Sequence, residues 1–171
     1  MNRRQFLKAG LVGGAVLAAG GAWVVWRDVR DADASSPPRD RIGEILGAIA
    51  PVILAGALPA PAAQRDIALA TVTSEVKEVI AAFPPAVQKE VHDLFRLLDI
   101  RIARRLLTGV TTNWRDADPA EVKAFLERWR WSWIALLQTG YFALHDLVLG
   151  AWYANEVAWA QLGYPGPPKL E

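Results

Sequence analysis

Residues 85–109 read PAVQKEVHDLFRLLDIRIARRLLTG, and this stretch decides the fold class. Its apolar residues recur three or four positions apart, which is the spacing of one face of an α-helix. Pro84 and Pro85 end the preceding helix and open this one, and Gly109 is suited to cap its C-terminus. The sequence therefore predicts one continuous helix with this apolar stripe: Val87, Val91, Leu94, Phe95, Leu98, Ile102, Leu106 and Leu107.

Helical patterns continue on both sides of this stretch. Asp40 is expected to cap a helix that runs to about Ala55, and Pro51 should kink or split that helix. A loop from Gly56 to Pro61 precedes a second helix over about 62–83. After the central stretch, a loop over 110–116 carries Trp114.

The C-terminal half has its own start and stop signals. Asp118-Pro119-Ala-Glu121 predicts a helix start, with Asp118 as the cap, Pro119 in the first turn and Glu121 reaching back as in a capping box. That helix runs to about 130, and further helices are expected over about 132–153 and 156–162. No alternation typical of strands appears, so the fold class is all-α, with five or six helices in a bundle-like packing after an N-terminal signal or anchor helix.

The predicted domain organisation is simple. Residues 1–34 form a leader, 35–39 a linker rich in Ser and Pro, and 40–171 a single helical domain. The last residues, 163–171, form a Pro-rich extended tail that cannot be helical.

The leader begins with Arg3-Arg-Gln-Phe-Leu-Lys8, followed by an 18-residue run without charge from Ala9 to Trp26. This pattern resembles a twin-arginine export signal, which a receptor reads and which directs folded proteins across the cytoplasmic membrane. A small-x-small site ending at Ala34 predicts cleavage before Ser35, and an uncleaved membrane anchor is the alternative. The motif residues are Arg3, Arg4, Phe6, Leu7 and Lys8, and the cleavage residues are Ala32 and Ala34.

Charge and composition exclude several functions. Residues 35–171 contain 14 basic and 15 acidic residues, so the alkaline pI of the whole chain comes from the leader and does not indicate nucleic-acid binding. The chain has no cysteine, which excludes covalently attached haem c, iron–sulfur clusters and a thiol nucleophile. With only His92 and His145, a multi-histidine metal site is not expected.

Candidate catalytic residues are few. His145-Asp146 and His92-Asp93 place a base beside an acid, but neighbouring residues on a helix point about 100° apart and are not expected to pair. The acidic residues of the central helices alternate with Lys and Arg, which predicts a solvated face. Arg101, Arg104 and Arg105 form a small basic cluster that we expect at an ordinary surface: the competing hypothesis is that it meets an acidic partner.

Tryptophan is concentrated in the C-terminal half, and the chain ends in a stiff Pro-rich segment. Trp is enriched at interfaces, and a Pro-rich segment loses little entropy when it docks. Both features predict a partner surface, with packing of the core and of the tail across its own bundle as the alternative. The predicted interface residues are Trp114, Trp129, Trp133, His145, Trp152, Tyr153, Trp159, Tyr164, Pro165 and Pro167.

Three motifs together resemble the gluconate 2-dehydrogenase subunit 3 family. They are the leader motif at 3–8, the run YFALHD at 141–146, and an end that reads GAWY at 150–153 and LGYPGPP at 162–168. With the spacing between them, the resemblance covers essentially the whole chain. The end motif is the part most specific to the family.

The resemblance implies a non-catalytic small subunit that holds no cofactor itself. In such complexes a large subunit similar to glucose-methanol-choline (GMC) oxidoreductases holds FAD, and a multihaem cytochrome c subunit often passes electrons onward. The large subunit frequently lacks an export signal, so the small subunit carries it folded through the twin-arginine translocon to the periplasm. The substrate belongs to the large subunit.

Two other hypotheses remain open on the sequence alone. A self-contained exported protein that binds an apolar ligand predicts a closed cavity lined by Leu, Ile and Trp. An enzyme predicts a cleft that gathers His145, His92 or several acids with shifted pKa values.

Overall fold

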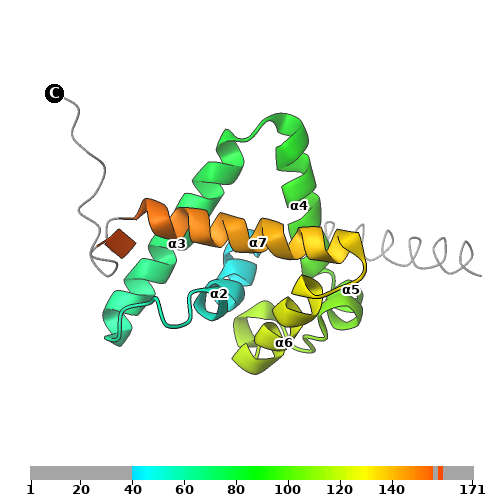
Figure 1. Ribbon diagram of the computed structural model, residues 1–171, viewed down its shortest axis with the longest axis horizontal. Helices are drawn as coiled ribbons and strands as arrows, with labels where there is room; N and C mark the ends of the chain where they lie inside the picture. Colours follow the sequence, from blue (N-terminus) through cyan, green and yellow to red (C-terminus); the bar gives the residue numbers. More distant parts are fainter. Residues whose placement is uncertain (1–39, 156–157, 160–171) are drawn as a thin grey trace, which may run out of the picture. The chain divides into compact units, whose positions relative to one another are not determined.

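The structure is a computed structural model, and it describes residues 40–155 and 158–159. Within these residues it contains six α-helices, a π-helical turn and a 3-10 turn, and no strand. The all-α prediction is therefore confirmed (Figure 1). The leader, with its predicted helix and cleavage site, and the tail over 163–171 lie outside the described residues.

Helix α2 (Arg41–Ile53) is the centre of the packing. It begins as predicted, because the Asp40 carboxylate accepts a hydrogen bond of 3.0 Å from the backbone N–H of Gly43. Pro51 does not split the helix, which corrects one of the two outcomes expected for it. The helix ends two residues later, so Pro51 lies in the last turn. The buried face consists of Ile45, Leu46, Ile49 and Ala50.

Helices α3 (Ala62–Ala82) and α4 (Pro85–Asp99) form a hairpin that turns at Pro84 (Figure 1). Phe83 and Pro84 both have extended backbone angles, and Pro85 is the first residue of α4. This boundary confirms the prediction that the two prolines end one helix and open the next. A proline is tolerated in the first turn because the N–H groups there have no partner within the helix.

The continuous helix expected over 85–108 is broken at Ile100, and this corrects the prediction. Ile100 is extended, with ψ 117°, and separates α4 from α5 (Arg101–Ala103) and a π-helical turn, η1 (Arg104–Thr108). In a continuous helix the carbonyl of Leu98 would accept from the N–H of residue 102. Here the indole Nε1 of Trp114 donates to that carbonyl at 2.9 Å. A contact from the following loop thus stabilises a break that periodicity cannot reveal.

Arg104 is buried at 3 % exposure, which corrects its expected place at the surface, whereas Arg101 and Arg105 are exposed as expected. Its guanidinium donates to the carbonyl of Asp99 at 3.5 Å and to Oδ1 of Asn113 at 3.4 Å. Burial lowers the pKa of this guanidinium, which still stays charged because arginine titrates far above neutral pH. The π-helical turn directs Arg104 inward and ends at Gly109, whose φ of 72° favours glycine.

We predict that Trp114→Phe destabilises the protein by about 1–3 kcal/mol, since it leaves the buried Leu98 carbonyl without its donor. Urea unfolding would measure the loss. Trp133→Phe is the matched control, because Trp133 is 93 % exposed and should change stability by no more than about 0.5 kcal/mol. Equal stabilities for the two variants would show that the indole bond does not stabilise the break.

Helices α6 (Pro119–Arg130) and α7 (Ala135–Ala154) complete the described residues. Asp118 caps α6 by accepting 2.8 Å from the N–H of Ala120, as predicted. The carboxylate of Glu121, however, is directed at Thr111, with both contacts at 3.5 Å, and not into the expected capping box. The 3-10 turn η2 (Trp114–Asp116) lies in the preceding loop and packs on α2.

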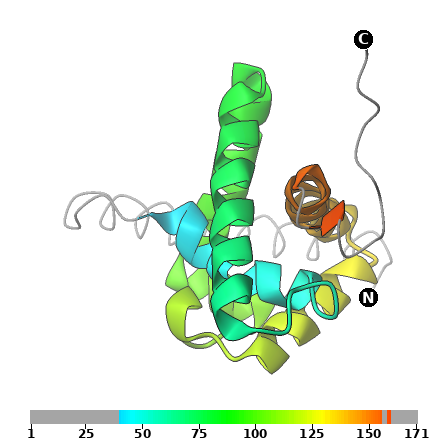
Figure 2. The ribbon, with the colours of Figure 1, turned by 90° about the vertical axis from the view of Figure 1, so that its left-hand side faces the viewer.

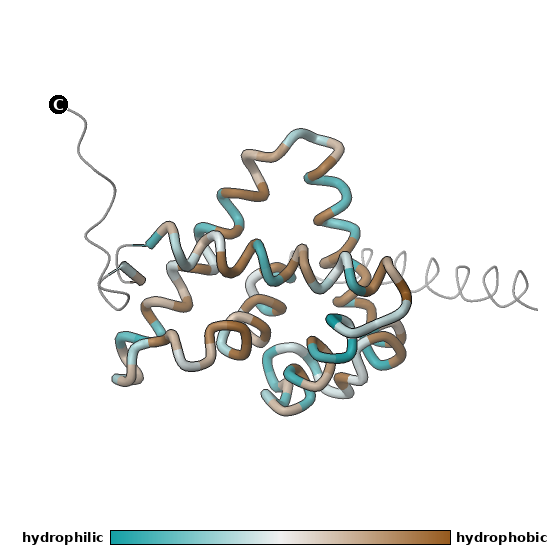
Figure 3. Tube along the Cα trace, viewed as in Figure 1, coloured by the Kyte–Doolittle hydropathy of each residue, from teal (hydrophilic) through white to brown (hydrophobic). Residues whose placement is uncertain are grey.

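One hydrophobic core joins all the long helices. Hydrophobic and hydrophilic residues alternate along these helices (Figure 3). Helix α7 crosses the α3–α4 hairpin and packs against α3, α6 and α2 (Figures 1 and 2). Helix α4 packs on α2 and α3 but is not among the elements packed closely on α7. This arrangement leaves a space between α4 and α7.

Candidate functional site

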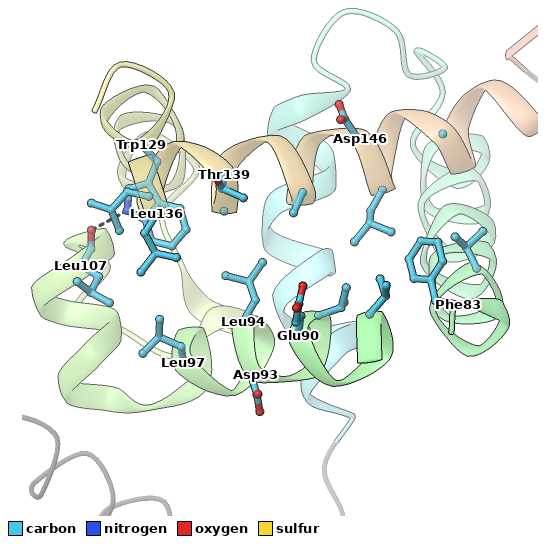
Figure 4. A pocket seen from close by; sticks show the side chains of 18 of the residues that line it. Phe83, Glu90, Asp93, Leu94, Leu97, Leu107, Trp129, Leu136, Thr139 and Asp146 are labelled. Carbon is cyan, nitrogen blue, oxygen red and sulfur yellow. Dashed lines mark hydrogen bonds between the residues drawn. The ribbon is translucent and has the colours of Figure 1, made fainter. Parts of the chain in front are cut away.

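An open apolar groove of about 790 Å³ lies between α4 and α7. The end of α3 and the start of the hairpin turn bound one end of it, and α6 bounds the other (Figure 4). Leu94 and Leu97 of α4 point into the groove from one side, and Leu136 of α7 faces them. Since several lining side chains are also exposed, including Leu136 at 76 %, the groove opens to solvent and is not an enclosed cavity.

Trp129 of α6 closes one end of the groove. Its Nε1 donates to the carbonyl of Leu107 at 3.0 Å, and its ring packs edge to face on Phe125 with centroids 5.1 Å apart. On α7, Gly140 lies against this ring, and an added Cβ there would come within 2.7 Å of Trp129 Cζ3. A small residue at 140 therefore lets α7 approach α6 closely enough to form this end of the groove.

We predict that Gly140→Ala leaves the protein about 1–3 kcal/mol less stable than Gly150→Ala. Both changes gain the same helix propensity, about 0.8–1 kcal/mol, because both lie within α7. They differ in surroundings, since nothing lies within 4 Å of a Cβ at 150. Thermal unfolding of the pair would measure the difference, and equal melting temperatures would contradict the close packing of Gly140 on Trp129.

The charged residues that line the groove are all acidic: Glu90 and Asp93 on α4 and Asp146 on α7. Asp93 and Asp146 point outward on opposite flanks, whereas Glu90 points into the space between the helices (Figure 4). Lys89 Nζ lies 2.6 Å from Asp93, and this hydrogen bond lowers the pKa of the Asp93 carboxyl. A lowered pKa is typical of a surface ion pair and is opposite to what a general acid needs.

An aromatic loop, residues 131–134, joins α6 to α7 and leads directly into the groove. Trp133 is 93 % exposed and Trp131 is 76 % exposed, and Ile134 is also exposed. The guanidinium of Arg130 lies over the Trp131 ring at 5.1 Å from its centroid. With Leu136, which lines the groove, the loop brings four exposed apolar residues into one segment of six positions.

The predicted interface residues divide into three groups. Trp114, Trp129 and Trp152 are each 2 % exposed and belong to the core, so their rings do not form part of an exposed surface. Trp133 and Tyr153 are exposed, and His145 and Trp159 are half-buried. Tyr164, Pro165 and Pro167 lie outside the described residues. The burial has a physical reason, since a chain of this size fills its core with its largest apolar rings.

His145 and Asp146 do interact, which corrects the expectation that helix geometry separates them. His145 Nδ1 lies 3.2 Å from Asp146 Oδ1, and the imidazole packs against the Tyr141 ring with centroids 5.3 Å apart and the planes tilted by 31°. Asp146 is highly exposed, and its freely rotating carboxylate can turn toward its neighbour. His92 is exposed on α4, so the groove does not bring the two histidines together.

A second, polar recess lies between α2 and α3. Four of the charged residues that line it form two ion pairs, Lys77 with Asp40 and Arg115 of η2 with Glu44 at 2.7 Å. The hydrogen bond from Lys77 lowers the pKa of the Asp40 carboxyl. Within the described residues, no three His, Asp or Glu side chains are grouped so that they would hold a metal ion. No helix in the same part of the chain has the length and apolar character that crossing a membrane requires.

Sequence reasoning missed the groove itself. Leu136, Leu94 and Leu97 show the same helical spacing as core residues, and only the separation of α4 from α7 leaves them uncovered. Trp131 was detectable, because it lies between the helix expected to end at about 130 and the helix expected from about 132, and side chains in such connections are seldom covered.

Comparison with known proteins gives one match. Residues 1–20 match the family described as the TAT (twin-arginine translocation) pathway signal sequence. No curated protein and no solved structure matches the chain. The chain thus carries a twin-arginine signal at its N-terminus, and this signal directs export across the cytoplasmic membrane to the periplasm.

Proposed function

We propose that this chain is the non-catalytic small subunit of a periplasmic flavin-dependent dehydrogenase. In this proposal it binds and stabilises a folded GMC-type catalytic subunit that holds FAD, and it supplies the twin-arginine signal for both. A multihaem cytochrome c subunit would complete the electron path. Tethering of the complex to the inner membrane through an uncleaved leader belongs to the same proposal.

The observation that carries the proposal is the exposed apolar surface of the aromatic loop on a chain with a twin-arginine signal. Trp133, Trp131 and Leu136 are between 76 % and 93 % exposed and lie in one short segment. An indole buries about 150–250 Å² in a contact, and each Å² of apolar area contributes about 25 cal/mol. Two exposed indoles only two positions apart in the sequence are typical of the anchors of a protein interface.

The twin-arginine route supports a folded partner. It exports folded proteins, so a second folded protein bound in the cytoplasm can cross with the chain that bears the signal. A chain with its own folded core and an exposed aromatic surface can hold such a partner before export. The family resemblance names the chemistry of that partner as a flavoprotein.

The test is capture of the exported chain through a C-terminal tag, with flavin absorbance and mass identification of what elutes. We expect one flavoprotein of the GMC kind per chain. Trp131→Ala combined with Trp133→Ala should weaken capture at least about thirtyfold, because a single anchor residue already contributes about 2 kcal/mol or more. Ile67→Ala on α3 is the control, since Ile67 is also exposed but lies away from the loop. A soluble monomer without flavin would contradict the proposal.

A second function has one observation in its favour. The groove volume of about 790 Å³ falls within the range of about 300–1,000 Å³ that small-molecule sites occupy. The chain could then be a self-contained exported protein that binds an apolar ligand. The open form of the groove favours it less than a closed cavity would.

A further inference from the structure

The groove has the form of a position from which one helix of a bundle is missing. Helix α7 packs on α2, α3 and α6, and α4 packs on α2, α3, α5 and η1, yet the two helices do not pack closely on each other. Their facing sides are nevertheless apolar, with Val87, Leu94 and Leu97 on α4 opposite Leu136 and Leu147 on α7. Because an apolar helix face is normally covered, this pair of faces lacks one element.

The dimensions fit a helix of three to four turns. The lining residues of α7 extend from Leu136 to Ala151, which is about 22 Å at 1.5 Å per residue. Those of α4 extend from Val87 to Leu97, or about 15 Å. On α7, Ala143 and Gly150 present little side chain to the groove, and an added Cβ at 150 would meet nothing within 4 Å. Small residues allow a partner helix to approach to the usual 8–10 Å between axes.

The charges define the chemistry of the occupant. All three charged lining residues are acidic, and two of them stand on opposite flanks of the groove (Figure 4). Asp93 already has Lys89 as a partner, whereas Glu90 has no ion pair among the described residues. The groove therefore disfavours an apolar ligand with a carboxylate head and favours an apolar segment with basic residues at its edges.

We propose that the groove between α4 and α7 binds an amphipathic helix of the catalytic partner, with an apolar face and Lys or Arg on both edges. This inference rests on the proposed function and adds the element of the partner that is bound. The apolar face would fill the space between Leu94 and Leu136, in the helix-in-groove mode of recognition. The basic residues would extend toward Asp146 on one flank and toward Glu90, which points into the space between the helices.

Two changes test the groove in the full chain. Gly150→Trp adds an indole at a position that lines the groove and has open space around it. Glu90→Lys with Asp146→Lys reverses the charge of the groove at two exposed positions. The matched controls are Gly47→Trp, where a Cβ also meets nothing within 4 Å but which faces the polar recess, and Glu78→Lys on α3. The readout is the amount of flavoprotein captured per tagged chain, at low and high salt.

We expect both groove variants to reduce capture at least about tenfold, with no change in either control, because like charges brought together at an interface cost several kcal/mol. Capture by the unchanged chain should also weaken as salt rises. A photo-crosslinking residue in place of Leu136 should join a helix of the flavoprotein that carries Lys or Arg.

The outcomes separate the two proposals. If the unchanged chain captures flavoprotein and the groove variants capture it equally well, the groove proposal is wrong and the small-subunit proposal stands. A crosslink from position 136 to a second copy of this chain, or to lipid, also overturns the groove proposal. If the unchanged chain captures no flavoprotein, the proposed function itself fails.

Discussion

Replacing Arg3 and Arg4 together with lysine is expected to lower the amount of this chain in the periplasm roughly tenfold or more. The substitution keeps both charges and removes the planar guanidinium forks, which bind two acceptors at once. Loss of such charge-assisted hydrogen bonds costs about 1.5–3 kcal/mol, and each 1.4 kcal/mol is a factor of ten in binding. Immunoblots of periplasmic and cytoplasmic fractions would measure the ratio.

The control for this prediction is Arg27→Lys with Arg30→Lys. This pair makes the same chemical change in the same leader, after the apolar run and outside the motif at 3–8. We expect it to leave the periplasmic fraction unchanged. An equal loss for both pairs would show that positive charge in the leader, and not the twin-arginine motif matched at residues 1–20, decides export.

Trp129→Ala is expected to cost about 3–5 kcal/mol of unfolding free energy. The change empties the space of a fully buried indole, removes its packing on Phe125, and deletes the hydrogen bond to the Leu107 carbonyl. Since a domain of this kind is stable by about 5–15 kcal/mol in total, the variant should unfold at a far lower temperature. Circular dichroism during heating would follow the helical signal.

Trp133→Ala is the matched comparison for Trp129→Ala. The two residues lie four positions apart, but Trp133 is 93 % exposed and Trp129 is 2 % exposed. We expect Trp133→Ala to change the unfolding free energy by no more than about 0.5 kcal/mol. Its effect should instead appear in partner capture. Similar melting temperatures for both variants would contradict the assignment of Trp129 to the core.

Much of the fold was predictable because its helix boundaries depend on local chemistry. Asp40 and Asp118 cap helices α2 and α6 by accepting hydrogen bonds from N–H groups two or three positions away. Pro84-Pro85 separates α3 from α4. The residues that form such a cap or break are close neighbours in the sequence, so the sequence alone is enough to predict the helix boundary. The export motif is likewise local, and the match over residues 1–20 confirms it.

The break at Ile100 could not be predicted, because its cause is distant in sequence. Trp114 captures the Leu98 carbonyl from 16 residues away, and the buried Arg104 donates to Asp99 and Asn113. The apolar stripe continues across the break with unchanged spacing, so periodicity alone predicts one helix. Arg104 was misplaced for the same reason, since it begins the π-helical turn η1 and is buried, while Arg101 and Arg105 lie at the surface as predicted.

For the candidate site, the sequence could predict which residue types would form it but not which of them would be exposed. A surplus of tryptophan indicated an interface, and composition could not distinguish core rings from exposed ones. Trp129 and Trp131 are two positions apart, which on a helix places them on different faces, and the end of α6 at Arg130 then exposes the loop that follows. The groove arises from the spacing of two helices that are neighbours neither in sequence nor in packing, so no single segment predicts it.

The central claim is that this chain carries a bound flavoprotein across the membrane, and one measurement tests it most directly. The flavin absorbance that co-purifies with the tagged chain would be measured from periplasm and from cytoplasm, for the unchanged chain and for Arg3→Lys with Arg4→Lys. The account predicts a flavoprotein bound one to one in the periplasm, and the same complex retained in the cytoplasm when the arginines are replaced. Flavoprotein that reaches the periplasm without the twin arginines, or a periplasmic chain that binds no flavin protein, would contradict it.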